Sequence, residues 1–323
     1  MTIVYASDDN YAGLTAVSAV SALKWNRGAR IVLLGCGLRG ESIELVRSRV
    51  ESHGGDFRHF DVSDRIAEIA ARGFSGYTSY AAYSRLFIAD LLAGENGRIL
   101  YLDCDTLILG PLDELFAMPM NGRPFAFGYD CILHAYKRYV NVADDEPYYN
   151  SGVMLANLSA WRAGGATVAL EAEFSHPRGP NPLGDQDMIV RAWKDFITPL
   201  SPKWNFLSQY FLFDYAGVRK INGTSAPWAE ESDYLSARES PAICHFSGHT
   251  LGRPWFTSSK HPMRQRYIEA AREAGVEQVA RQTRPMSLPY AVQYRLWKLL
   301  PRAVFQPIAR LMLRLHILMT YKA

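Results

Sequence analysis

The feature that most constrains the fold of this chain is the alternation, over roughly its first hundred residues, of short apolar runs with segments of helical periodicity. Apolar runs predict buried strands over residues 3–6 and 31–34 and a further strand over residues 98–102, and residues 56–62 suggest a strand between them. Apolar residues recur at helical spacing over residues 14–24, 42–48 and 80–92. Strands that alternate with helices predict an α/β fold in which helices cover both faces of a mostly parallel sheet.

Two of the predicted strands end in acidic or amide side chains. Asp8, Asp9 and Asn10 follow the first strand, and Asp103 and Asp105 follow the fourth. Ligands of open α/β sheets bind beyond the carboxyl ends of the strands. We therefore expect both groups in one candidate site at the same edge of the sheet.

The Asp103-Cys104-Asp105 segment has the spacing of a metal site. In an extended chain residues i and i+2 face the same way, so the two carboxylates share one side and Cys104 points into the fold. A hard cation such as Mn²⁺ or Mg²⁺ suits oxygen ligands and leaves positions open for substrate phosphates. The alternative is a chance surface pair, but apolar runs on both sides make uncompensated charges costly here.

Other polar residues are candidates that also have a purely structural explanation. Asp8 and Asn10 are suited to hydrogen bonds with a base or a ribose, although both residue types are also favoured in turns and helix caps. His245 is a reasonable third metal ligand, but a histidine that follows an apolar run is more often part of the core. His249 competes with His245 for the same role.

Beyond residue 105 the pattern is less regular. Two strands, one helix and one long loop are expected, over residues 125–129, 152–155, 185–193 and 223–240 respectively. From about residue 286 the composition changes to aromatic residues, leucine and arginine, which indicates an appended helical tail. We accordingly divide the chain into a main domain over residues 1–280 and a basic, aromatic tail over residues 281–323.

Charge is distributed unevenly along the chain. The net charge is only +3, which argues against a nucleic-acid-binding protein. No Asp or Glu follows Glu277, and eight Lys and Arg side chains do, which leaves the rest of the chain mildly acidic. Basic and aromatic residues interleaved on helices suit an anionic membrane surface. The alternative is a helix packed on the protein's own body.

The cysteines and the first residues bear on the compartment. Cys36, Cys104, Cys131 and Cys244 are far apart and form no CxxC pair, which argues against a disulfide framework and a structural zinc site. The chain begins with an apolar segment that lacks the pattern of a signal peptide, and no stretch is apolar enough to span a membrane. We expect a cytoplasmic protein, peripheral on the inner face of the membrane.

Several segments, taken in order, resemble those of family 8 retaining glycosyltransferases. They lie at residues 3–11 (IVYASDDNY), 83–86 (YSRL), 98–116 (RILYLDCDTLILGPLDELF), 148–158 (YYNSGVMLANL), 184–188 (GDQDM), 203–206 (KWNF), 245–248 (HFSG) and 253–255 (RPW). The chain is most similar to the bacterial lipopolysaccharide galactosyltransferases and glucosyltransferases, and glycogenin is a more distant relative. Because the resemblance covers nearly the whole chain, it is more specific than any single motif.

The resemblance implies the nucleotide-sugar transferase fold called GT-A, a UDP-galactose or UDP-glucose donor, Mn²⁺, and transfer with retention of the anomeric configuration. It also implies a saccharide or lipid-linked saccharide acceptor, as in the synthesis of lipopolysaccharide or a related surface glycan. The implied residue roles are metal ligands for Asp103, Asp105 and His245, uridine contacts for Ala6, Asp8 and Asn10, donor-sugar contacts for Arg85, Asn150, Asp185 and Gln186, and a place toward the acceptor for Asp130.

One segment departs from the family pattern. The family has Gly-x-x-Lys-Pro-Trp after the metal histidine, with the lysine on the diphosphate. Here the segment from Gly248 to Trp255 is two residues longer, and Arg253 replaces the lysine. Arginine binds a diphosphate as a planar fork rather than as a point charge. The longer loop leaves the geometry of diphosphate binding open and makes His249 a further candidate contact.

The expected mechanism follows from these roles. Gln186 is an amide and a poor nucleophile, which favours attack by the acceptor hydroxyl on the face from which UDP leaves, without a covalent intermediate. Asp130, Asp185 and Asp187 remain alternative nucleophiles. Two other functions also remain open: a catalytically silent nucleotide-sugar-binding protein, and another metal-dependent nucleotidyl or phosphoryl enzyme. The small number of clustered histidines argues against a phosphohydrolase.

Overall fold

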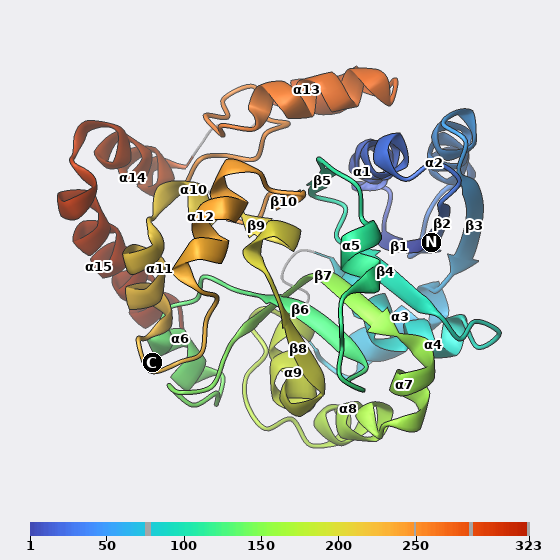
Figure 1. The fold of residues 1–323 in the computed structure, drawn as a ribbon, viewed down its shortest axis with the longest axis horizontal. Helices are drawn as coiled ribbons and strands as arrows, with labels where there is room; N and C mark the ends of the chain where they lie inside the picture. Colours follow the sequence, from blue (N-terminus) through green and yellow to red (C-terminus); the bar gives the residue numbers. More distant parts are fainter. Residues whose placement is uncertain (75–78, 249, 284–286, 322–323) are drawn as a thin grey trace.

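The structure is a computed structural model that describes residues 1–74, 79–248, 250–283 and 287–321. Figure 1 shows a central twisted sheet with helices on both of its faces and the last two helices, α14 (Leu288–Leu299) and α15 (Arg302–Tyr321), together at one side.

Seven strands form the main sheet, in the order β3-β2-β1-β4-β7-β6-β8. Their bounds are Thr2–Ser7 for β1, Arg30–Gly35 for β2, Asp56–Asp61 for β3, Arg98–Leu102 for β4, Phe125–Tyr129 for β6, Tyr149–Asn157 for β7 and Ile197–Leu200 for β8. β1 pairs in parallel with β2 and β4, β2 with β3, and β6 with β8, whereas β7 is antiparallel to both of its neighbours. The predicted mostly parallel α/β sheet is therefore confirmed, with β7 reversed.

Helices cover the sheet on both sides because alternate strand residues enter two apolar cores. On β1, Val4 and Ala6 belong to one core and Ile3 and Tyr5 to the other. The helices of this half of the molecule are α1 (Ala12–Trp25), α2 (Gly40–Ser52), α3 (Ser63–Ala71), α4 (Ile88–Leu91), α5 (Asp113–Ala117), α6 (His134–Tyr139), α7 (Leu158–Ala163), α8 (Ala166–Ser175) and α9 (Asp185–Trp193). Helices on both faces, expected from the sequence, are thus confirmed.

The prediction of one regular helix over residues 80–92 is wrong in the type of helix. A 3-10 helix, η1, spans Tyr80–Phe87, and only α4 continues it as an α-helix. Residues 83–86 are all buried, so the segment packs on every side and has no single amphipathic face. Tertiary packing rather than helical periodicity sets its backbone.

A second, small sheet places one of the candidate metal ligands. Its strands are β5 (Thr106–Ile108), β10 (Ile243–His245) and β9 (Phe206–Leu207), in the order β5-β10-β9. β10 is antiparallel to β5, with His245 opposite Thr106. This pairing brings the end of β10 directly beside Asp105, across a sequence separation of about 140 residues.

The second half of the chain is mainly short helices. They are η2 (Lys194–Phe196), η3 (Pro202–Trp204), α10 (Ser208–Leu212), α11 (Tyr215–Asn222), α12 (Glu231–Glu239), α13 (Arg264–Glu273) and η4 (Glu277–Arg281). The prediction of a loop over residues 223–240 is wrong in its second half, which α12 occupies. Only Tyr234 and Ala237 of α12 are buried, and two apolar positions among charged residues give little helical signal.

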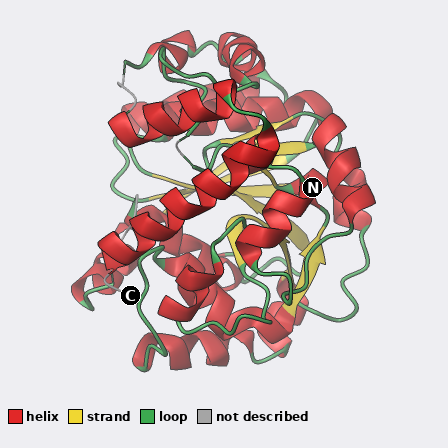
Figure 2. Ribbon diagram, turned by 90° about the vertical axis from the view of Figure 1, so that its left-hand side faces the viewer, coloured by secondary structure: helices red, strands yellow, loops and turns green. Residues whose placement is uncertain are grey.

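The helical tail is confirmed, and its two helices pack on the rest of the chain. Phe305 of α15 is fully buried and stacks on Phe213, with ring centroids 6.0 Å apart. Figure 2, which looks at this side of the molecule, shows helices lying across the front of the strands. Among the residues that the structure describes, no helix combines the length and apolar character that crossing a membrane requires.

Candidate active site

Two adjoining cavities lie beyond the carboxyl ends of β1 and β4. The larger, of about 260 Å³, is lined among others by Arg85, Asp103, Asp105, Asp130, Asn150, Asp185, Gln186, His245, Gly248 and Arg253. The smaller, of about 80 Å³, is lined by Ala6, Asp8 and Tyr11 and shares Arg85, Asp103, Asp105 and Arg253 with the larger. Most candidate residues of the sequence analysis thus meet at one site, but Asp9, Asn10 and Asp187 line neither cavity.

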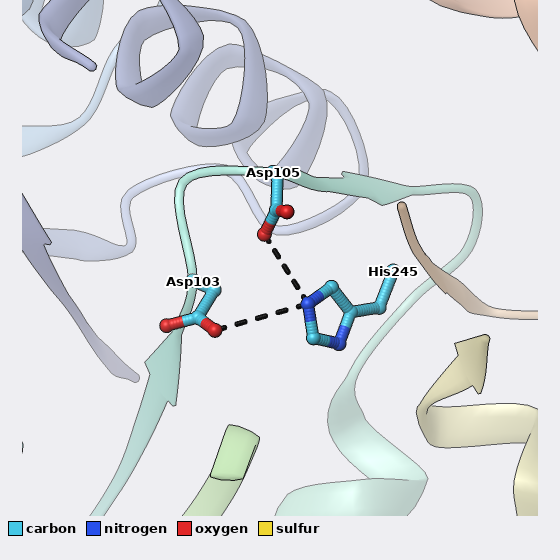
Figure 3. Close-up of side chains that lie close together, drawn as sticks. All are labelled: Asp103, Asp105 and His245. Carbon is cyan, nitrogen blue, oxygen red and sulfur yellow. Dashed lines mark ion pairs between the residues drawn. The ribbon is translucent and has the colours of Figure 1, made fainter. Parts of the chain in front are cut away.

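Asp103, Asp105 and His245 form the centre of this site. One ligand atom from each lies within 4.8 Å of the others, and no second cluster of this kind occurs in the described part of the chain. His245 Nε2 is 3.2 Å from Asp105 Oδ1 and 3.7 Å from Asp103 Oδ2, so the ring nitrogen faces both carboxylates (Figure 3). Cys104 turns the other way, and its Sγ contacts the carbonyl oxygen of Ala6 at 3.1 Å.

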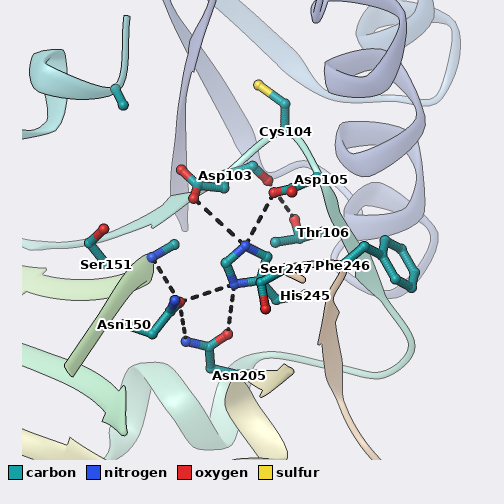
Figure 4. Close-up of polar contacts among 12 residues, drawn as sticks. Asp103, Cys104, Asp105, Thr106, Asn150, Ser151, Asn205, His245, Phe246 and Ser247 are labelled. Carbon is teal, nitrogen blue, oxygen red and sulfur yellow. Dashed lines mark hydrogen bonds and ion pairs between the residues drawn. The ribbon is translucent and has the colours of Figure 1, made fainter. Parts of the chain in front are cut away.

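Two asparagines fix the orientation of the His245 ring. Nδ1 lies 3.0 Å from Asn150 Oδ1 and 3.2 Å from Asn205 Oδ1, and Asn205 Nδ2 donates to Asn150 Oδ1 at 2.9 Å (Figure 4). Because two amide oxygens face Nδ1, that nitrogen carries the proton. Nε2 then presents its lone pair to the space between Asp103 and Asp105, as a metal-binding histidine does.

The charges of this cluster shift one another's pKa values. Burial alone would lower the pKa of His245, but the carboxylates of Asp105 and Asp103 outweigh it, so this pKa lies above its usual value. Burial would raise the pKa of the Asp105 carboxyl, but His245 and Arg253 outweigh it and hold that pKa well below its usual range. Asp105 is therefore ionised at neutral pH and available as a ligand.

The residues present fit a divalent cation. Two carboxylate oxygens and one imidazole nitrogen are ligands for Mn²⁺ or Mg²⁺, and three protein ligands leave coordination positions for a diphosphate. Gly152 on β7 keeps the space between the ligands open. A Cβ atom there would lie 2.2 Å from His245 Cε1 and 2.7 Å from Asp103 Oδ2.

Two arginines balance the carboxylates from either side. Arg85 is buried, 3.1 Å from Asp103 Oδ1 and 2.7 Å from Asp185 Oδ2, and its guanidinium lies over the ring of Tyr101. Arg253 forms an ion pair with Asp105 and donates to the carbonyl oxygen of Phe246. Both guanidinium groups line both cavities, where they face any anionic ligand.

Gln186 lines the larger cavity and is held there by hydrogen bonds. Its Oε1 accepts from the backbone N–H of Ser151 at 3.0 Å, and its Nε2 donates to Asp130 Oδ2 at 3.0 Å. Asn150 Nδ2 also donates to Asp130 Oδ2, at 3.1 Å. Burial raises the pKa of Asp130 despite these donors, and it raises the pKa of Asp185 to about 6 despite Arg85.

Asp187 lies outside the cavity wall. Its carboxylate accepts from Tyr148 Oη at 2.5 Å, from Tyr136 Oη at 3.1 Å and from the backbone N–H of Leu183 at 2.8 Å. Burial raises the pKa of Asp187 to about 6, although these donors oppose the shift. With three donors on its two oxygens, this carboxylate anchors the N-terminal turn of α9.

The residues after β1 form a turn as well as part of the smaller cavity. Asp8 Oδ1 accepts from the backbone N–H of Asn10 at 2.9 Å, which is the turn contact that its residue type favours. Asp8 Oδ2 accepts from the hydroxyl of Ser79 at 2.7 Å. His249, the competing candidate ligand, lies outside the described residues.

Comparison with known proteins decides the class of protein. Residues 2–259 match the model described as Glycosyl transferase family 8. The chain belongs to this family. General stress protein A of Bacillus subtilis (strain 168) is 29% identical over 274 residues, which are 83% of this chain and 92% of that protein. Glycosyltransferase GlyF of Streptococcus pneumoniae is 23% identical over 264 residues, and the match spans 82% of this chain but 59% of GlyF.

Solved structures show the same fold for this family 8 chain. The galactosyltransferase LgtC, in a complex with donor and acceptor sugar analogues, has a TM-score of 0.67 at 24% identity and is matched over 84% of this chain and 95% of its own. The apo form of glycosyltransferase GlyE from Streptococcus pneumoniae TIGR4 has a TM-score of 0.58 at 19% identity over 95% of this chain and 62% of its own. The GT-A-type fold expected from the sequence is thereby confirmed.

The sequence analysis did not identify some of the residues that line the two cavities. Tyr11 lines the smaller cavity, and Gln209 and Ser247 line the larger one. Asn205, which holds His245, lies in a segment whose resemblance to the family was noted without any role. Tyr11, directly after Asn10, and Ser247, within the segment at residues 245–248, offered a signal in the sequence, whereas the place of Asn205 beside His245 depends on the pairing of β9 with β10.

Proposed function

We propose that this family 8 glycosyltransferase moves galactose or glucose from a UDP-sugar to a saccharide acceptor with retention of the anomeric configuration, using Mn²⁺, or Mg²⁺ in its place. The observation that carries the proposal is that Asp103, Asp105 and His245 converge beside Arg253. The smaller cavity, with Ala6 and Asp8, lies on one side of this cluster, and the larger one, with Gln186 and Asp130, lies on the other. In this proposal the first cavity takes the base and ribose, and the second takes the donor sugar and the acceptor.

The charges of the site suit a diphosphate leaving group. A cation held by the two carboxylates and His245 would draw charge from the diphosphate as UDP leaves. Arg253 contributes a planar fork of N–H donors at the boundary of the two cavities. Arg85 keeps Asp103 and Asp185 in place and neutralises part of their charge.

The surroundings of Gln186 support attack from the face that UDP leaves. Its amide is uncharged, and its hydrogen bonds to Asp130 and Ser151 hold it in the cavity wall. The carboxylate of Asp187 is occupied by three donors and does not line the cavity, which argues against it as a nucleophile. Asp130 and Asp185 do line the cavity, so a glycosyl adduct trapped on either and detected by mass spectrometry would overturn the front-face route.

The test is turnover of a panel of UDP-sugars by purified protein with and without Mn²⁺, read as released UDP. We expect one hexose donor to give metal-dependent release, Asp103→Asn to abolish it, and the exposed Asp113→Asn to leave it unchanged. NMR of the product should show the anomeric configuration of the donor. Donor binding without release in any acceptor extract would support a silent binding protein, and release of a free sugar phosphate would support a nucleotidyl or phosphoryl enzyme.

We propose further that α14 and α15 contact an anionic membrane surface on the cytoplasmic side, where a lipid-linked acceptor of lipopolysaccharide or related glycan synthesis would be presented. Exposed apolar and basic side chains are interleaved on the two helices: Leu288, Arg295, Lys298, Leu299, Arg302, Leu311, Arg314, Leu315 and Met319. Such helices bind by apolar insertion together with attraction to anionic lipids. Phe305 and Ala309 face inward, so the body and a membrane would occupy opposite sides of α15.

Sedimentation with vesicles tests this contact. We expect the full chain to sediment with phosphatidylglycerol-containing vesicles at low salt, to be released at high salt, and to stay in solution with phosphatidylcholine vesicles. Arg302→Glu together with Arg314→Glu should abolish sedimentation, whereas charge reversal at the exposed Arg72, far along the chain, should not. Failure of the full chain to sediment at low salt would contradict the proposal.

A further inference from the structure

The loop of residues 250–253 carries Arg253, and glycines in the left-handed region lie at residues 248 and 252. Gly248 has φ +80° and Gly252 has φ +73°, conformations that other residues adopt at a cost. Between them Leu251 is almost fully buried, and its carbonyl oxygen accepts from the backbone N–H of Lys260 at 2.9 Å. Thr250 and Leu251 are therefore packed in the interior shortly before Arg253 in the chain.

A residue of the tail holds this loop from the outside. Thr250 Oγ1 donates to Gln293 Oε1 of α14 at 2.5 Å. Both residues are more than nine-tenths buried, with 8% and 6% of their surfaces exposed. In a buried pair of this kind, removing one partner leaves the other without a hydrogen bond and away from water, which is costly.

Apolar side chains of α14 also pack on the rest of the protein. Tyr294, Leu296 and Trp297 pack against the core that contains Leu251 and Trp255. None of the cavity-lining residues belongs to α14, so the helix acts on the site only through the loop.

We propose that Gln293 is a positioning residue: through Thr250 it fixes the loop that presents Arg253 to the diphosphate, so the docking of the tail sets the affinity for the donor. The inference rests on the proposed binding of a UDP-sugar at this site. It assigns to α14 a part in donor binding that is separate from any contact with a membrane. It also explains how a longer loop keeps its arginine at the diphosphate position.

Calorimetric titration with UDP in the presence of Mn²⁺ tests the inference on the full chain. We expect Gln293→Leu and Thr250→Val each to weaken UDP binding about five- to tenfold, the loss of one buried hydrogen bond. The double variant should be no weaker than either single variant, because both changes remove the same contact. Thr250→Ser, which keeps the hydroxyl, and Arg295→Ala, on the exposed side of α14, should bind UDP like the unaltered protein.

Titration with Mn²⁺ alone separates a local effect from misfolding. Gln293→Leu should not lose its Mn²⁺ affinity, because all three proposed ligands remain and loosening Arg253, which pairs with Asp105, removes none of them, whereas an unfolded variant would lose both affinities. If Gln293→Leu fails to fold, Thr250→Val decides the question. Unchanged UDP affinity in a folded variant, or additive losses in the double variant, would overturn the role of Gln293 and leave the proposed function intact. An unaltered protein that binds no UDP would refute the proposed function, and the inference with it.

Discussion

At the scale of residues, the site is a balance of buried charges. Asp103 and Asp105 face each other across His245, and Arg85 and Arg253 neutralise them from outside. The arrangement holds two carboxylates close together and places a guanidinium group beside each. A cation bound here would take over part of the role of Arg253 at Asp105, and the guanidinium would then be available to a second anion.

Gly152 gives the first test at this scale. In Gly152→Ala the new Cβ atom would overlap His245 Cε1 and Asp103 Oδ2, so one of the two metal ligands must move. We expect Mn²⁺ affinity to fall at least about tenfold, the usual effect of disturbing a ligand's support. Gly110→Ala is the matched control, because nothing lies within 4 Å of the added atom. Equal Mn²⁺ affinities in both variants, measured by titration, would contradict the assigned site.

The pH dependence of Mn²⁺ binding gives the second test. Mn²⁺ needs an unprotonated Nε2, and the pKa of His245 lies above its usual value because Asp105 and Asp103 outweigh the effect of burial. Affinity should therefore fall as the pH drops through that raised pKa, by about tenfold per unit below it. The ion pairs of protonated His245 stabilise the metal-free protein at low pH, and this contribution is lost as the pH rises through the same pKa.

Free Mn²⁺ measured by electron paramagnetic resonance between pH 5.5 and 8 would follow this titration. His176→Asn changes an exposed histidine and should leave the profile unaltered. A flat profile in the unaltered protein would show that His245 does not bind the metal.

At the scale of elements, the first half of the sheet was predictable and the part that completes the site was not. β1, β2 and β4 follow from apolar runs, and the acidic residues after β1 and β4 mark the edge at which the cavities lie. β9 has two residues and β10 has three, too few for any periodic pattern. Their pairing with β5 brings His245 to Asp105, and no local signal encodes such long-range contacts.

The two corrected segments have related causes. Residues 80–87 form a 3-10 helix whose central residues are buried on all sides, including Arg85, which ordinary periodicity would place in solvent. α12 has only two buried residues, so its sequence resembles a polar loop. In both cases the surrounding packing decides the local structure, which a single sequence does not display.

An ion pair behind α9 gives a prediction at this scale. Arg191 Nε is 2.7 Å from Glu173 Oε1, with both side chains buried, and α9 carries Asp185 and Gln186 into the cavity. Arg191→Met leaves Glu173 buried with only a half-exposed partner, and we expect it to lower the free energy of unfolding by about 3–5 kcal/mol. Arg178 pairs with the same carboxylate, but its side chain is 54% exposed, so it provides the matched control.

Urea denaturation would compare these two variants. Arg178→Met should cost no more than about 1 kcal/mol, as exposed pairs do. Equal losses in the two variants would show that the buried pair does not anchor α8 to α9.

At the scale of the whole molecule, the site draws on residues from Ala6 to Arg253, and the tail packs on the same body. The division at residue 280 remains a prediction, but Phe305 and Ala309 of the tail are fully buried. Phe305→Ala should therefore lower the free energy of unfolding by about 3–5 kcal/mol. Leu311→Ala, at a position 58% exposed on the same helix, should change it by less than about 0.5 kcal/mol. A negligible effect of Phe305→Ala would mean that the tail is undocked in solution.

The central claim is that Asp103, Asp105 and His245 bind the cation that holds a UDP-sugar donor. The most direct test is an anomalous difference map, at the manganese edge, of crystals grown with Mn²⁺ and UDP. The account predicts one strong peak within bonding distance of all three side chains, with diphosphate oxygens completing its coordination and Arg253 turned toward the diphosphate. A peak elsewhere, or UDP bound in this cavity with no metal between it and the two carboxylates, would contradict it.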